Sequence, residues 1–255
     1  MNFRHPYLAD TKFACFAHRG GGLEQPENSR KAFEAARALG YRFIEIDVQA
    51  SRDGVLVVFH DDHLDDLTDG KGVVSELPIA EVTQAKIGGS EPMMTLEEAL
   101  ADFPEMRFNI DIKTDHALQP ALDLMEKMNC LDRVCLASFS DERLHAVRRH
   151  FGSAVCSGAG PRDVRILKFG SWGLPGRDVE ALCAQVPSKY GCITLPTRRF
   201  VKYCNARGIA VHVWTIDEEA EMRRLIRIGV NGLITDRPTL LKRIAMEEGV
   251  WEEFG

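Results

Sequence analysis

Two histidines in this sequence are suited to proton transfer. His18 ends a short apolar run and starts the sequence His-Arg-Gly-Gly-Gly, while His60 ends a second apolar run and precedes Asp61 and Asp62. An imidazole can accept or donate a proton near neutral pH, and a neighbouring carboxylate can hold it in position. We therefore interpret His18 and His60 as a catalytic acid/base pair, with either Asp61 or Asp62 as an orienting group.

Acidic side chains recur with strand spacing in residues 43–48, which read Phe-Ile-Glu-Ile-Asp-Val. A period of two puts Glu45 and Asp47 on one face and the apolar side chains on the other. If the acidic face is turned to the protein interior, its two like charges need a compensating cation. Because hard divalent ions prefer oxygen ligands, the pair predicts one Mg2+ or Ca2+ ion. An edge strand with its acidic face in water is the alternative.

Residues 109–113 repeat this pattern in a second strand-like segment. Asp111 and Lys113 share one of its faces, so Asp111 is the candidate third metal ligand and Lys113 a candidate partner for phosphate. Arg19, directly after His18, offers a planar guanidinium that can bind two phosphate oxygens. A metal ion together with these two cations predicts a substrate that carries a phosphate group.

His212 and Trp214 lie two residues apart in an apolar, strand-like run. We interpret His212 as a core histidine with its polar atoms hydrogen-bonded. Trp214 shares its face and either walls a substrate pocket or packs in the core. The remaining histidines lie in polar or helical surroundings and are expected to be exposed: His5, His63, His116, His145 and His150.

Strand-like and helix-like segments alternate along the chain, which is typical of a parallel sheet covered by helices. Setting aside the apolar run at 55–59, eight strands are predicted, at 13–17, 43–48, 107–112, 134–137, 154–156, 181–186, 209–216 and 232–235. Amphipathic helices are predicted at 28–39, 118–128, 141–150, 200–206, 218–228 and 238–246, and a capping box at Thr95 and Glu98 opens another.

Eight such units in 255 residues predict an α/β fold closed into a (β/α)8 TIM barrel. An open doubly wound sheet is the alternative, and the sequence favours it less because no G-x-G-x-x-G follows the first strand. Nothing divides the chain, so residues 1–255 are expected to form one domain. Residues 60–94 are too long for a connecting loop and are interpreted as a small capping insertion over the barrel mouth.

Composition excludes several classes of protein. The net charge of −6 argues against a nucleic-acid binder. No signal peptide is recognised at the N-terminus and no run reaches the roughly 18 apolar residues of a membrane span, so we expect a cytoplasmic protein without stable membrane insertion. Its binding partner would be a small-molecule phosphodiester substrate. The sequence does not decide whether the protein is a monomer or a homodimer.

The cysteines give no sign of a structural cluster. Their number, seven, is odd and no pair has C-x-x-C spacing, so neither a disulfide framework nor a zinc cluster is predicted. Most lie in apolar runs, where a free thiol packs as a small apolar group. They are Cys15, Cys130, Cys135, Cys156, Cys183, Cys192 and Cys204.

Several ordered motifs together resemble the glycerophosphodiester phosphodiesterases, over about residues 16–241. They are His18-Arg19-Gly20, Pro26-Glu27-Asn28-Ser29, Glu45-x-Asp47-Val48, Ser51-x-Asp53-Gly54-Val55, His60-Asp61, Thr68-x-Gly70-x-Gly72, Thr95-Leu96-Glu97-Glu98, Val213-Trp214-Thr215 and the run from Gly229 to Pro238.

The resemblance implies a barrel with a small insertion after His60, and metal-dependent hydrolysis of glycerophosphodiesters to glycerol phosphate and an alcohol. His18 and His60 match the family's acid/base pair. Glu45 and Asp47 match two metal ligands, and Arg19 and Lys113 match phosphate-contacting positions. Asp111 stands where the family usually has Glu, and its shorter arm would ligate through a shifted metal or a water.

Alternatives to this activity remain open. Gln185-Val186-Pro187 and Gly191-Cys192-Ile193-Thr194 resemble the lysophospholipase D-like branch of the family, whose substrates would need an apolar groove. Candidate groove residues are Phe169, Trp172, Leu174, Met93 and Met94, with loop packing as the equal alternative for them. A barrel that binds a phosphodiester without turnover is a further alternative. A zinc amidohydrolase would normally show His-x-His in its first strand, which this sequence lacks.

Overall fold

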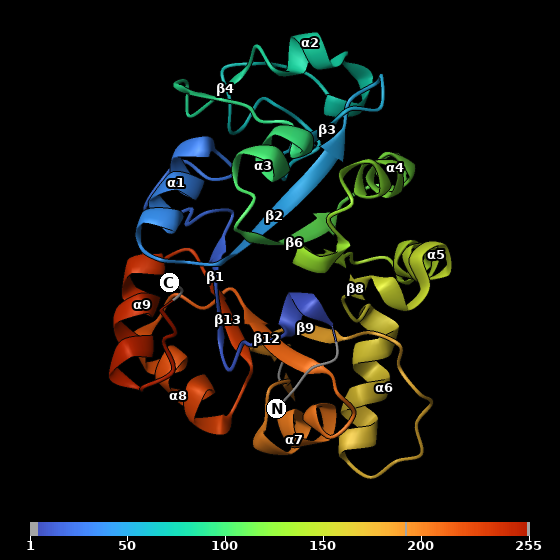
Figure 1. The fold of residues 1–255 in the computed structure, drawn as a ribbon, viewed down its shortest axis with the longest axis vertical. Helices are drawn as coiled ribbons and strands as arrows, with labels where there is room; N and C mark the ends of the chain where they lie inside the picture. Colours follow the sequence, from blue (N-terminus) through green and yellow to red (C-terminus); the bar gives the residue numbers. More distant parts are fainter. Residues whose placement is uncertain (1–4, 192, 254–255) are drawn as a thin grey trace.

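The structure is a computed structural model that describes residues 5–191 and 193–253. Eight parallel strands form a sheet at its centre, with helices on the outside (Figure 1). The strands are β1 (Ala14–His18), β2 (Phe43–Ala50), β6 (Arg107–Ile112), β7 (Val134–Ala137), β8 (Cys156–Ser157), β9 (Cys183–Pro187), β12 (Ala210–Trp214) and β13 (Gly232–Thr235). Each falls within about two residues of a predicted strand.

The sheet curls into the predicted barrel. Neighbouring strands follow the order β8-β7-β6-β2-β1-β13-β12-β9. Its two end strands, β8 and β9, meet through one parallel bridge between Gly158 and Cys183. Backbone hydrogen bonds from Ala159 N to Cys183 O (2.7 Å) and from Leu182 N to Ser157 O (3.0 Å) complete this seam. The seam is therefore the part of the ring with the fewest strand-to-strand bonds.

Helices connect the strands and cover the outer face. They are α1 (Arg30–Ala38), α3 (Leu96–Asp102), α4 (Leu118–Met128), α5 (Asp141–Phe151), α6 (Pro161–Ser171), α7 (Arg198–Asn205), α8 (Glu219–Ile228) and α9 (Pro238–Glu247). Short 3-10 turns lie at η1 (Pro6–Leu8), η3 (Leu131–Arg133) and η4 (Gly152–Ala154), and β10 (Lys189–Tyr190) pairs with β11 (Ile193–Thr194) after β9.

Local capping explains where several helices begin. The predicted capping box is confirmed: the Thr95 hydroxyl accepts the Glu98 backbone N–H, and the Glu98 carboxylate accepts the Thr95 backbone N–H. Ser140 caps α5 as expected, with its hydroxyl accepting the Arg143 N–H. The sequence patterns do not predict α6, which begins at Pro161 without a side-chain cap.

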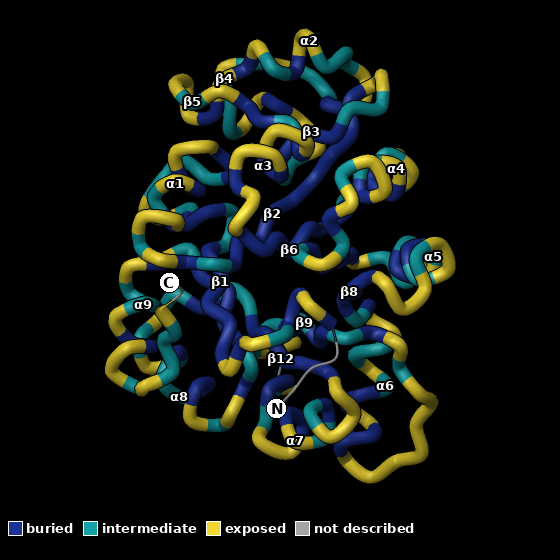
Figure 2. The backbone as a smooth tube through the Cα atoms, viewed as in Figure 1, coloured by how far each residue is buried: buried dark blue, intermediate teal, exposed yellow. Residues whose placement is uncertain are grey.

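Two separate apolar cores lie on either side of the sheet. Ile44, Ile46 and Val48 of β2 pack outward with the helices, so the predicted division of this strand into two faces is confirmed. A smaller core fills the barrel interior and includes Phe16 and Phe43. Figure 2 shows the strands buried and the outer sides of the helices exposed. Glu45 and Asp47 consequently belong to the inward face.

Residues 60–94 form an inserted segment between β2 and α3. The segment follows β3 (Leu56–Val58), which pairs antiparallel with the end of β2, and it contains η2 (Val74–Glu76), α2 (Ile79–Val82), β4 (Lys86–Ile87) and β5 (Glu91–Pro92). It has a small apolar core of its own that includes Leu64, Val74 and Ile87. In Figure 1 it lies beyond the end of β2, at the top of the view.

Candidate active site

Strand register brings the predicted polar residues together at the carboxyl ends of β1, β2 and β6. His18 lies opposite Glu45, and Asp47 lies opposite Asp111. The carboxyl ends of parallel strands share one rim of a barrel, where active sites are built. Lys113 follows directly after β6 and reaches the same point.

His60 reaches the same rim by a reversal of the chain. Because β3 runs antiparallel to β2, with Val58 opposite Val48, the chain returns to the level of Asp47. The Phe59 N–H donates to the Asp47 carbonyl (3.0 Å). Burial works to raise the Asp47 pKa, but Lys113, Arg19 and, least of the three, the nearby His60 hold it below its ordinary value. The His60 Nδ1 pairs with Asp61, so Asp61 rather than Asp62 is the carboxylate that contacts the imidazole.

The turn after β1 holds Arg19 in a strained conformation. Arg19 has a φ of +52° and Gly20 a φ of +83°. A side chain at Gly20 would place its Cβ 2.6 Å from the Ala32 Cβ, so this glycine is required for the close approach of α1. Strain of this kind is retained where the surrounding structure demands it, often at functional sites.

Arg19 and Lys113 neutralise the buried acidic groups. Arg19 Nη1 lies 2.8 Å from Glu27 Oε1, and its Nε lies 2.9 Å from Asp47 Oδ2. Lys113 Nζ bridges Asp47 Oδ1 (2.9 Å) and Asp111 Oδ2 (3.1 Å). Removing one member of such a buried network leaves the others uncompensated. The two cations predicted to contact phosphate thus already lie side by side around Asp47.

His18 is held between two carboxylates. Its Nδ1 lies 2.8 Å from Asp236 Oδ1 and its Nε2 lies 3.6 Å from Glu45 Oε2. Burial works against protonation, but Glu45 and the hydrogen bond with Asp236 raise the His18 pKa to about 9. The carboxylate on one ring nitrogen orients the imidazole and leaves the other nitrogen directed to the site.

Each of the three predicted metal ligands has a buried oxygen that makes no hydrogen bond within the described residues. These oxygens are Glu45 Oε2, Asp47 Oδ2 and Asp111 Oδ1. Burial, followed by the charge of Asp47, raises the Glu45 pKa to about 8, and burial also raises the Asp111 pKa. Arg19 already pairs with Asp47 Oδ2, but buried carboxylates that repel one another and have oxygens free of hydrogen bonds suit a bound divalent cation.

These three carboxylates are neighbours without converging on one point. In residues 5–191 and 193–253, the only three His, Cys, Asp or Glu ligand atoms within 4.8 Å of one another belong to cysteines. The Lys113 ammonium group lies between Asp47 and Asp111. Asp111 is one carbon shorter than glutamate, which keeps its carboxylate close to the strand.

The site contains three polar residues to which the sequence analysis gave no role. Asp236 orients His18, and Glu27 pairs with Arg19. Asn28 is only 1% exposed, and both polar atoms of its side chain lack a partner among the described residues. All three lie in the motifs that carry the family resemblance, so the signal was present, but nothing in their spacing assigned them to a histidine or an arginine.

Two aromatic side chains, Trp214 and Phe139, lie beside the site near Lys113. Trp214 is the last residue of β12, and its ring meets the Phe139 ring edge to face at 5.7 Å. Phe139 in turn lies 6.0 Å from Lys113 Nζ. Trp214 therefore approaches the Lys113 side of the site, through Phe139, as well as the inner core.

The structure separates the candidate groove residues into two sets, and for Met93 and Met94 it favours the alternative of packing. Phe169, Trp172 and Leu174 are about half exposed and lie together at the end of α6. Met93 and Met94 are buried in two different cores, because they belong to the base of the inserted segment. The two sets cannot line one groove. Cys192, part of the second branch motif, lies outside the described residues.

Two other histidines differ from expectation. His5 is buried rather than exposed, because its Nδ1 accepts the Tyr7 N–H and its Nε2 lies 3.1 Å from the Ala154 carbonyl. His212 lies in the barrel core beside Phe16, as expected, but its Nδ1 has no hydrogen-bond partner among the described residues. Burial lowers the His212 pKa from 6.5 to about 3.

We expect His212 to make the protein less stable in acid. Between pH 6.5 and about 3 the unfolded chain protonates this residue while the folded chain does not, so its contribution to stability falls by about 1.4 kcal/mol per pH unit. The variant His212→Leu should show a flatter fall in urea stability from pH 6.5 to 4.5 than the wild type. Equal slopes would contradict the expectation.

Comparison with known proteins places the chain in one enzyme family. A family model described as the glycerophosphoryl diester phosphodiesterase family matches residues 18–240. A Mycobacterium tuberculosis protein named probable glycerophosphodiester phosphodiesterase 2 is 37% identical, over 93% of this chain and 92% of its own. Lysophospholipase D GDPD1 of Rattus norvegicus is 25% identical, over 89% of this chain and 84% of its own.

Solved structures with the same fold are also similar. A glycerophosphodiester phosphodiesterase from Agrobacterium tumefaciens str. C58 superposes with a TM-score of 0.75 at 20% identity, over 92% of this chain and 99% of that chain. An Oleispira antarctica phosphodiesterase, solved with the product sn-glycerol-3-phosphate, has a TM-score of 0.75 at 21% identity, over 91% and 96%. At these identities the likeness shows the barrel fold.

Within the described residues, the helices are too short or too polar to cross a bilayer.

Proposed function

Because the chain belongs to the glycerophosphoryl diester phosphodiesterase family, we propose that it hydrolyses glycerophosphodiesters, at the rim where β1, β2 and β6 end. The products are glycerol phosphate and an alcohol. The observation that carries the proposal is the gathering of His18, Arg19 and Lys113 with three buried carboxylates at this rim. A related barrel from Oleispira antarctica holds sn-glycerol-3-phosphate, which is a product of this reaction.

The chain's own cations bind the phosphate. Arg19 and Lys113 lie on either side of Asp47, and a phosphate beside them would receive donors from both. A divalent ion, Mg2+ or Ca2+, would be held by Glu45, Asp47 and Asp111 and would polarise a phosphate oxygen as a Lewis acid. The buried oxygens of these residues that make no hydrogen bond within the described part of the chain support this ligand set.

His18 and His60 move the protons. One imidazole takes the proton of the attacking hydroxyl, which belongs to water or to the substrate's own glycerol, and the other protonates the leaving alcohol. Asp236 and Asp61 hold the two rings in position. Residues 60–94 begin at His60, and in this proposal they cap the mouth and limit the access of water.

Lysophospholipids are a second candidate substrate class. Four exposed apolar residues follow carboxyl ends of barrel strands and so lie at the mouth: Leu23, Phe139, Tyr190 and Ile193. These side chains suit contact with an acyl chain, and a relative at 25% identity is named a lysophospholipase D. The half-exposed Phe169 and Trp172 lie at the end of α6 and are not counted among these four residues.

A substrate screen tests the proposal. Purified protein, stripped with EDTA, should release glycerol phosphate from glycerophosphocholine or glycerophosphoethanolamine only after Mg2+ or Ca2+ is restored. We expect faster turnover of these substrates than of lysophosphatidylcholine at matched concentrations. The reverse order would favour the second candidate, and an absence of metal-dependent turnover on every substrate would sink the proposal.

A further inference from the structure

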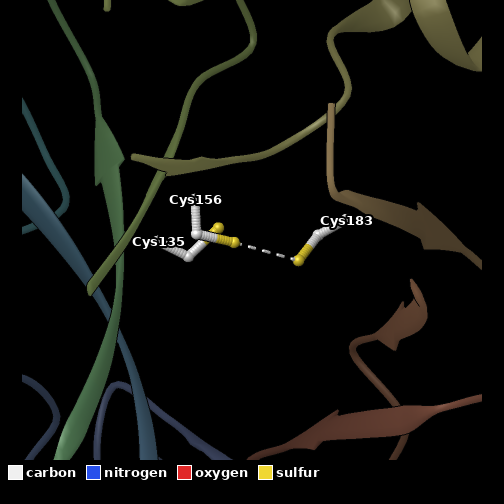
Figure 3. Close-up of side chains that lie close together, drawn as sticks. All are labelled: Cys135, Cys156 and Cys183. Atoms are coloured by element: carbon white, nitrogen blue, oxygen red, sulfur yellow. Dashed lines mark hydrogen bonds between the residues drawn. The ribbon is translucent and has the colours of Figure 1, made fainter. Parts of the chain in front are cut away.

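Three cysteine thiols lie together inside the barrel, away from the proposed active site. Cys135 belongs to β7, Cys156 to β8 and Cys183 to β9. The three sulfurs lie within 4.8 Å of one another, and those of Cys156 and Cys183 are 3.6 Å apart (Figure 3). All three side chains are buried, and all three thiols are free.

The spacing of these sulfurs suits a single metal ion. Thiolates bind Zn2+ at about 2.3 Å, which puts two ligand sulfurs of one ion about 4 Å apart. Three sulfurs within 4.8 Å need only small side-chain movements to reach that arrangement. Soft thiolate ligands select Zn2+ or Cu+ over the hard cations that carboxylates prefer. The cluster is therefore chemically distinct from the carboxylate site.

The surroundings of the cluster contain further polar groups without another role. Tyr7 packs in the same interior core as the three thiols, and its buried hydroxyl has no partner in the described part of the chain. Burial works to raise the Cys135 pKa, but hydrogen bonds from Cys156 and Cys183 and the charges of His5 and Arg148 hold it below its ordinary value. Burial and the hydrogen bond with Cys135 raise the pKa of Cys156, and the hydrogen bond with Cys135 and burial raise the pKa of Cys183, so the three thiols share their protons unequally.

We propose that Cys135, Cys156 and Cys183 bind one thiophilic metal ion of the Zn2+ or Cu+ kind, as a structural site. The sequence analysis predicted no zinc cluster, because the ligands come from three separate strands and lack C-x-x-C spacing. Register places Cys135 beside Asn109, two residues before Asp111, so this thiol lies deeper in the barrel than the Asp111 carboxylate.

The position of the cluster indicates what the ion would do. The strand β8 is held to β7 by two residue pairs, and to β9 by the one bridge between Gly158 and Cys183. An ion bound to one residue from each of these strands would join the ring where it has the fewest backbone bonds. An ion that binds the folded state but not the unfolded chain stabilises the folded protein. Here it would do so by holding β7, β8 and β9 together at the seam of the barrel.

The inference is tested by refolding the full chain with Cd2+ or Zn2+, because a fully buried site is loaded most readily during folding. We expect one equivalent of Cd2+ to remain after gel filtration and brief EDTA treatment. Thiolate-to-metal charge-transfer absorption in the ultraviolet should accompany it, together with a higher Tm than for protein refolded without metal.

Two cysteine variants and two controls assign the site. Cys156→Ala and Cys183→Ala should lose the retained ion and its absorption, while Cys204→Ala, which removes an equally buried thiol of α7, should keep both. Glu45→Gln should also keep them, since its carboxylate belongs to the other site. Should an alanine variant fail to fold, the corresponding serine variant replaces it, and the wild-type absorption still decides.

Two results would overturn the inference. One is wild-type protein that refolds with Cd2+ or Zn2+ present yet retains no ion and shows no thiolate absorption. The other is a folded Cys183 variant that retains as much thiolate-bound ion as the wild type. The carboxylate site is not involved in either readout, so loss of phosphodiesterase activity would be a separate outcome.

Discussion

His18→Ala should lower kcat by about 10²- to 10⁴-fold on a glycerophosphodiester, the range that general acid or base groups contribute. The imidazole is held at its Nδ1 by Asp236 and presents its Nε2 beside Glu45, so its removal takes a proton-transfer group out of the centre of the site. The measurement is steady-state turnover at saturating metal, with Tm as a check on folding.

The companion variant His60→Ala should show a loss of similar size, and the leaving group separates the two roles. A substrate with a nitrophenol leaving group needs no protonation as its bond breaks, so the variant that lacks the general acid should recover most of its rate. The variant that lacks the base should not. Asp236→Asn keeps the size of the orienting group and should cost less than His18→Ala. Normal turnover by either alanine variant would remove that histidine from the mechanism.

Glu45→Gln should raise the concentration of Mg2+ or Ca2+ that gives half-maximal turnover by at least about tenfold. A roughly tenfold loss of metal affinity is the lower end of the effect seen for residues that only support a metal ligand, so a ligand itself should cost at least this much. The change keeps the side chain's shape but removes the charge of a buried carboxylate whose Oε2 makes no hydrogen bond among the described residues and lies 3.6 Å from His18 Nε2. Turnover against metal concentration measures the effect. An unchanged curve would show that Glu45 does not hold the cation.

The metal response of the wild type should also depend on pH, with a definite sign. Burial and the charge of Asp47 raise the Glu45 pKa to about 8, so below this pH the cation must displace a proton from the carboxyl group. Metal affinity should therefore rise with pH until about 8, and the rise should be smaller in Glu45→Gln. Asp111→Glu provides a matched control, because it keeps the charge and should retain metal dependence.

The local elements of the fold were determined by the sequence to a large extent. Alternating segments gave the eight parallel strands, and serine or threonine caps fixed where α3 and α5 begin. A period of two along residues 43–48 was enough to divide β2 into an apolar outer face and an acidic inner face. These features are local, because caps and side-chain periodicity depend on residues a few positions apart.

Much of the proposed site was also foreseeable, because the carboxyl ends of parallel strands meet at one rim. That rule brought His18, Glu45, Asp47 and Asp111 together without further information. Which side chains pair was not foreseeable. Asp236 comes from 218 positions further along the chain to bind His18, and only strand order places β13 beside β1.

The thiol cluster and the buried histidines depend on the tertiary structure alone. Cys135, Cys156 and Cys183 are distant in sequence, and each reads as an ordinary apolar position of a strand. His5 is buried because a 3-10 turn folds against the barrel, which no local pattern signals. The sequence specified which face each residue takes on its own element. The closing of the ring decided which faces meet, because that closure depends on all eight strands at once.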